Sequence, residues 1–153
     1  MKVCIIYGSE SGNSERAVKA IAKTWQGSNF EIGEIMEGAT AAGRGVAALA
    51  GQLARLDGAP LLELAAGSGS VSRHISKISH LAASTQLAFD ASVEALSELR
   101  CGETAVAGDL HGLPFTQRSM HLITSQFGVE YAGLDGFSSA FDCVSAGGYF
   151  AFV

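Results

Sequence analysis

The sequence predicts a doubly wound α/β fold: a mostly parallel sheet of about seven strands, covered by helices in three αβα layers. Apolar, β-branched runs alternate along the chain with segments whose apolar residues recur at helical spacing. Glycine-rich turns join several of these runs to the next helical segment, and the chain has 19 glycines for such turns. With 153 residues, of which 48% are hydrophobic and 16% charged, the chain is predicted to form a single packed domain, 1–153.

The pattern places the elements in order along the chain. Strands are expected at 2–7, 30–35, 60–65, 85–89, 103–107, 120–124 and 149–153. Ser14 caps a first helix whose apolar stripe ends at Trp25. Further helices are expected at 45–56, 71–81, 92–99 and 136–144. Gly147 and Gly148 predict a turn before the closing strand.

Composition excludes several classes of function. The formal net charge is −5 and no Lys/Arg cluster occurs, which argues against a nucleic-acid partner. The apolar runs are too short to span a membrane or to form a signal sequence, so the cytoplasm is the expected location. The histidines and cysteines show no metal-ligand spacing. An exposed edge strand would make a homodimer plausible.

Two glycine turns raise the question of which one forms the working site. The second turn lies in LLELAAGSGSVS, where Glu63 ends a strand and Gly67 and Gly69 precede a helix. Glycines let the backbone approach a nucleotide closely. Asp90 ends the next strand, from which a carboxylate can reach ribose hydroxyls, and Asp109 follows the strand after that.

These motifs carry a resemblance to a known family. Residues 43–153 resemble class I S-adenosylmethionine-dependent methyltransferases, which have a Rossmann-like fold. The matching stretches, in the family's order, are LLELAAGSG, FDASVEAL, AGDLHGLPF, SMHLITSQFGVEYA and FDCVSAGGYFAFV. The resemblance implies an S-adenosylmethionine site and transfer of a methyl group to a small-molecule acceptor.

The resemblance also implies roles for individual residues. The amino-acid and ribose end of the cofactor falls to Glu63, Ala65, Gly67 and Gly69. The ribose falls to Asp90, the adenine to Asp109 and Leu110, and part of the pocket wall to Gln126. No catalytic base is assigned, since displacement at a sulfonium methyl depends chiefly on alignment of the reacting atoms. His111 is a minor catalytic candidate.

The chain departs from the family pattern at three places. Ala65 stands where the family usually has its first glycine, and His121 where an Asp is common. The core, 42–153, lacks the family's last two strands, which usually help to form the substrate pocket. An enzyme inactive through truncation is therefore one of the expectations.

The first glycine turn, YGSESGNSE, has a different resemblance. Residues 1–40 are similar to the start of a flavodoxin, a βαβ segment with a phosphate loop. On this alternative an FMN phosphate would be held by Ser9, Glu10, Ser11, Gly12, Asn13 and Ser14. The chain would then be an FMN-binding electron carrier, or a folded chimera without activity. In the chimera the segment 1–41 would add its strands to the sheet edge beside the methyltransferase-like core.

Overall fold

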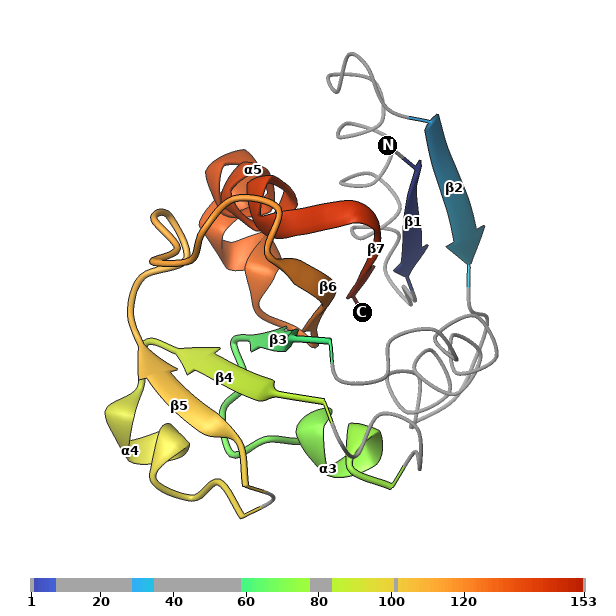
Figure 1. Ribbon diagram of the computed structural model, residues 1–153. Helices are drawn as coiled ribbons and strands as arrows, with labels where there is room; N and C mark the ends of the chain where they lie inside the picture. Colours follow the sequence, from blue (N-terminus) through green and yellow to red (C-terminus); the bar gives the residue numbers. More distant parts are fainter. Residues whose placement is uncertain (1, 8–28, 35–58, 78–83, 101, 153) are drawn as a thin grey trace.

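Figure 1 shows the computed structural model of the protein, which describes residues 2–7, 29–34, 59–77, 84–100 and 102–152. These residues form one sheet of seven strands in the order β2-β1-β7-β6-β3-β4-β5. All neighbouring strands run parallel, which confirms the predicted parallel α/β fold. The strands are β1 (Lys2–Tyr7), β2 (Asn29–Glu34), β3 (Leu61–Leu64), β4 (Gln86–Asp90), β5 (Thr104–Ala107), β6 (Met120–Ser125) and β7 (Val144–Phe152).

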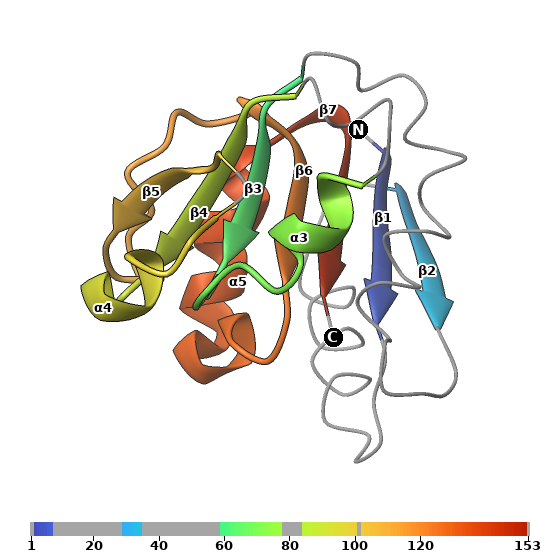
Figure 2. The same cartoon turned by 90° about the horizontal axis from the view of Figure 1, so that it is seen from below.

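Helices cover both faces of this sheet, as Figure 2 shows for α3 and α5. On one face, α5 (Gly133–Cys143) packs through Phe137 and Phe141 against the sheet. The strand residues in this cluster include Leu62, Leu64, Phe89, Ile123 and Phe150. On the other face lie α3 (Ser72–Ile75) and α4 (Val93–Leu96). All four residues of β3 are buried, because a parallel strand covered on both faces has no side exposed to water.

The two N-terminal strands extend the same sheet at one edge. β1 pairs with β7, with Cys4 opposite Tyr149, and β2 pairs with the outer side of β1. The flavodoxin resemblance of residues 1–40 stays a prediction. The helices predicted at 14–25 and 45–56 lie outside the described residues, as does the phosphate loop at 9–14.

Three local predictions need correction. The sequence predicts a turn at Gly147 and Gly148, but β7 runs through both residues. Gly147 has φ +78°, and the pairing between β6 and β7 shifts register there, so the glycines form a bulge inside a strand. The helix predicted at 136–144 begins earlier, at Gly133, and ends at Cys143. The helix predicted at 92–99 is regular only over Val93–Leu96.

Gly148 explains why the chain needs a small residue in this bulge. A side-chain carbon at Gly148 would lie 3.0 Å from the carbonyl oxygens of both His121 and Ser145. The backbone of β6 therefore approaches β7 closely at this point. Two adjacent glycines thus mark a bulge here, although the same pair usually marks a turn.

Candidate cofactor-binding site

The candidate site lies where strands β3, β4, β5 and β6 end. From β3 the chain moves outward to β4 and then β5, and it returns to the other side of β3 with β6. The strand order reverses between β3 and β6. In open α/β sheets, ligands bind outside the carboxyl ends of the strands at such a switch point. The loops that follow β3 and β6 are therefore the first place to look for a ligand.

The loop after β3 depends on left-handed backbone conformations. Ala65, Gly67 and Gly69 have φ values of +51°, +53° and +81°. Glycine adopts this region without steric penalty, whereas an alanine there is strained by about 1–2 kcal/mol. The Ala66 N–H donates to the Phe89 carbonyl across 3.0 Å, which ties this loop to the end of β4. The alternating pattern predicted from LELAAGSG is thus a tight loop with left-handed residues at alternate positions, the first of which is an alanine.

Glu63 lies buried on β3, with 3% of its surface exposed. One carboxylate oxygen accepts from the Val71 N–H at 3.0 Å, and the other from the Ser72 N–H at 2.8 Å and from the Ser72 hydroxyl. Burial raises the pKa of Glu63, the bonds from Ser72 and Val71 offset part of this rise, and the negative charge of Glu103 adds to it. The carboxylate therefore holds the far end of the loop, where α3 begins.

Asp90 joins the loop after β3 (residues 65–70, called the cofactor loop below) to the end of β4. One of its carboxylate oxygens accepts from the Gly67 N–H at 2.8 Å, and the other accepts from the Ser92 N–H at 2.7 Å. The Ser92 hydroxyl in turn accepts from the Ala95 N–H at 3.1 Å and caps α4. Asp90 is half-buried, and each oxygen keeps a lone pair for a further donor. The remaining lone pairs of this carboxylate could accept hydrogen bonds from two ribose hydroxyls.

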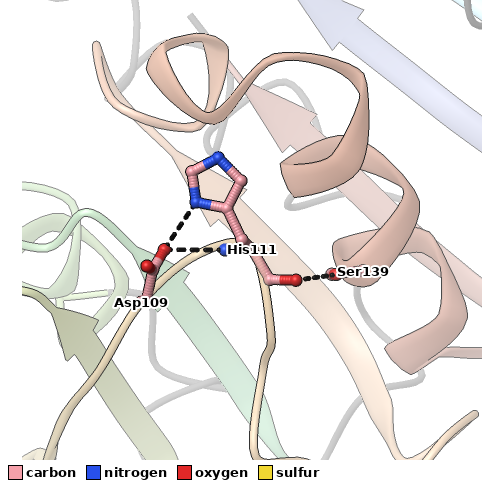
Figure 3. A network of polar contacts seen from close by, with 3 residues as sticks. All are labelled: Asp109, His111 and Ser139. Atoms are coloured by element: carbon pink, nitrogen blue, oxygen red, sulfur yellow. Dashed lines mark hydrogen bonds and ion pairs between the residues drawn. The ribbon is translucent and has the colours of Figure 1, made fainter.

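Asp109 and its neighbours follow β5, as Figure 3 shows. One Asp109 oxygen accepts from the His111 N–H at 2.9 Å and lies 2.7 Å from His111 Nδ1. These hydrogen bonds hold the pKa of Asp109 below its ordinary value. The Ser139 hydroxyl on α5 donates to the His111 carbonyl at 3.3 Å. Leu110, by contrast, turns inward and packs against the core under α5.

The partner of Asp109 gives a direct prediction. In His111→Ala the ring nitrogen and its hydrogen bond are lost, so the pKa of Asp109 should rise toward that of an ordinary aspartate. Carboxyl-carbon NMR across an acid titration measures this. His74→Ala is the control, because its ring nitrogen lies against the Ser70 carbonyl, outside this cluster. An unchanged Asp109 titration in His111→Ala would contradict the assignment of that bond.

Gln126 contacts the cofactor loop from the other side of the switch point. Its side-chain carbonyl accepts from the Ser70 hydroxyl at 2.8 Å. Two residues later, a side-chain carbon at Gly128 would lie 2.0 Å from the Ala65 methyl, so no residue larger than glycine fits there. The loop after β3 and the loop after β6 are therefore bound together by one hydrogen bond and one close contact.

The structure brings together most of the residues that the sequence nominates. Glu63, Ala65, Gly67, Gly69, Asp90 and Gln126 all belong to β3, β4, β6 or the loops at their carboxyl ends. Asp109 and Leu110 follow β5, the next strand outward. The sequence places Ser92 as the cap of the helix after β4, and the structure confirms this cap. Sequence reasoning missed Ser70 and Gly128, whose only signal was that they lie in the loops that follow strands, which does not say what they contact.

The described residues form neither a metal-binding cluster nor a membrane-spanning helix. Residues 59–77, 84–100 and 102–152, with β1 and β2, contain no group of three or more His, Cys, Asp or Glu placed to hold a metal ion. In the same part of the chain no helix is long and apolar enough to cross a bilayer.

Comparison with solved structures relates the fold to one group of enzymes. An S-adenosylmethionine-dependent methyltransferase from Mesorhizobium loti matches with a TM-score of 0.56 and 27% identity, over 69% of this chain and 50% of that one. A protein from Bacillus halodurans, described as a methyltransferase, matches with a TM-score of 0.54 and 25% identity, over 66% of this chain and 47% of that one. One from Methanococcus maripaludis, named for dependence on S-adenosyl-L-methionine, matches with a TM-score of 0.54 and 18% identity, over 68% and 53%.

The chain therefore has the Rossmann-like α/β fold of class I S-adenosylmethionine-dependent methyltransferases. It spans about half the length of the structures that it matches. No protein-family model matches the sequence, and no curated protein matches it.

Proposed function

We propose that this chain binds S-adenosylmethionine at the carboxyl ends of β3 to β6 and forms the cofactor half of a methyl-transfer site. The observation that carries the proposal is the Asp90 carboxylate. It accepts from the Gly67 N–H of the cofactor loop, and each of its oxygens keeps a lone pair for a ligand. The structural likeness to methyltransferases supports the same cofactor. FMN has no comparable support among the described residues.

The residues present fit this cofactor in charge and in shape. Ribose offers two hydroxyl donors, and the free lone pairs of Asp90 accept from such donors. Gly67 has no side chain, and nothing lies within 4 Å of where one would begin, so a ligand can approach this backbone directly. Asp109 is well exposed and carries a second oxygen that the bonds from His111 do not use, which suits the adenine amino group.

The sequence assigns Glu63 to contact with the cofactor, but its hydrogen bonds give it a positioning role instead. Its oxygens are occupied by Val71 and Ser72, so we assign it to positioning the loop. Gln126 closes the other side of the site through Ser70. When bound, the cofactor supplies an electrophilic methyl group on a sulfonium. The chain's contribution is to hold that end of the cofactor fixed between the two loops, so that a small-molecule acceptor meets it in line.

Calorimetric titration with S-adenosylhomocysteine tests the proposal. Asp90→Asn keeps the shape of the side chain but replaces an acceptor with an amide donor, so affinity should fall by about 10–100-fold. Asp135→Asn is the matched control, since Asp135 is an exposed aspartate in the first turn of α5. Equal affinity in the wild type and Asp90→Asn would refute the site. Absence of heat in the wild type, together with tight binding of FMN, would overturn the choice of cofactor.

A further inference from the structure

Phe127 combines two features that are seldom found together. Its backbone has φ +55°, in the left-handed region that a bulky residue rarely adopts. Its side chain is 66% exposed, although it is one of the larger apolar side chains in the chain. The first feature strains the backbone, and the second gives up the burial that would offset the strain. Something other than packing within the described residues must account for this conformation.

The neighbours of Phe127 hold it in place from both sides. Gln126 is bound by the Ser70 hydroxyl, and Gly128 lies against the Ala65 methyl. One residue further on, the Val129 N–H donates to the Ser125 hydroxyl at 3.1 Å. The backbone is thus fixed immediately before and after Phe127, which leaves its side chain pointing out of the fold. Strained residues persist where the surroundings overdetermine them, and such places are commonly binding sites.

The position of Phe127 relates it to the candidate cofactor site. It is the second residue after β6, at the switch point where the loops after β3 and β6 meet. The same segment exposes two further apolar side chains, Tyr131 and Leu134. We propose that Phe127 contacts the methyl acceptor and selects an acceptor that carries a flat, apolar group, which packs on the phenyl ring. This inference rests on the proposed function.

The chemistry of the ring defines the class of acceptor. A phenyl ring offers no hydrogen bond, so it contributes affinity through burial of apolar area and through stacking on another ring. A planar aromatic acceptor gains both terms. A puckered aliphatic acceptor of equal size gains only the first. A small charged amine gains neither and has only a cation–π contact with the ring, which is weak at an exposed site.

Three small alcohols or amines serve as probes of this selection. They are 2-naphthol, its saturated counterpart decahydro-2-naphthol, and ethanolamine, each measured by saturation-transfer NMR with and without S-adenosylhomocysteine. The wild type should bind 2-naphthol most tightly, and Phe127→Ala should weaken that binding by about 10-fold. Phe127→Trp should retain it. Val93→Ala is the matched control, because Val93 is an equally exposed apolar residue, on α4.

A second measurement separates recognition from a structural role. Phe127→Asn places a residue that tolerates the left-handed region, so the thermal midpoint should rise while 2-naphthol binding is lost. A lower midpoint would show that Phe127 serves packing and would overturn the inference. Equal binding of 2-naphthol by the wild type and Phe127→Ala, or equal affinity for the saturated probe, would overturn it too.

The outcome is distinguishable from a failure of the proposed function. Phe127→Ala should bind S-adenosylhomocysteine as the wild type does, since the ring lies outside the contacts of Asp90 and the glycine loop. If the wild type binds no S-adenosylhomocysteine, the proposed cofactor is wrong. The titrations of 2-naphthol without it still report on Phe127.

Discussion

Gly128→Ala should destabilise the fold by about 3 kcal/mol, because the added methyl would lie 2.0 Å from the methyl of Ala65. Neither loop can move away easily. The Ser125 hydroxyl receives the Val129 N–H on one side, and the Ser70–Gln126 hydrogen bond fixes the other. Urea unfolding followed by far-UV circular dichroism measures the change in the free energy of unfolding.

The double variant Ala65→Gly/Gly128→Ala should recover most of that loss. With glycine at position 65, the nearest remaining atom of that residue lies 3.5 Å from the new methyl, an ordinary contact. The change also removes an alanine from a left-handed conformation, so Ala65→Gly alone should be neutral or slightly stabilising. The two changes are therefore strongly non-additive. A double variant as unstable as Gly128→Ala would show that the two methyl groups do not meet.

Glu63→Ala should cost about 3 kcal/mol of folding stability and abolish binding of S-adenosylhomocysteine. The change leaves two backbone N–H groups and the Ser72 hydroxyl without their acceptor in a buried place. The loop would lose the contact that holds it to α3. Glu98→Ala is the control, since Glu98 is an exposed glutamate. Stability and affinity equal to those of the wild type would contradict the role given to Glu63.

Glu63 also predicts a dependence on pH. Since burial raises its pKa in the folded protein, the folded state holds this proton more tightly than the unfolded state does. The resulting stabilisation is complete below the pKa of glutamate in an unfolded chain, about 4.3. It is lost as the pH rises through the raised value. The stability of the wild type relative to Glu63→Gln should therefore decrease with pH across that window, and a relative stability that increases would reverse the sign.

The sequence predicted the parts of this fold that depend on local pattern. Short apolar stretches located β3, β4 and β6, because strands of a parallel sheet covered on both faces are rich in apolar residues. The glycine spacing located the loop after β3, since left-handed backbone favours glycine. The likeness to solved methyltransferases confirms the Rossmann-like fold that those motifs implied.

Contacts between loops could not be read from the sequence. Ser70 and Gln126, like Ala65 and Gly128, are far apart along the chain and meet only because β3 and β6 are neighbours in the sheet. The same limit applies to Glu63. Its place at a strand end suggested contact with a ligand, whereas the structure directs its carboxylate to Val71 and Ser72. Whether Glu63 contacts a ligand or the backbone depends on how deeply its side chain is buried, and a sequence pattern does not give burial.

The pairing of β1 with β7 has a consequence for how the chain folds. Residues 4–6 pair with residues 149–151, so β1 and β7 are neighbours in the sheet although they are far apart along the chain. β7 is also the only strand that links β1 and β2 to β6 within the described sheet. During synthesis β1 and β2 therefore emerge before β7 and can pair only with each other until β7 has left the ribosome. Parallel pairing over such a separation carries a large loop-closure entropy, and we expect this step to be the slow phase of refolding.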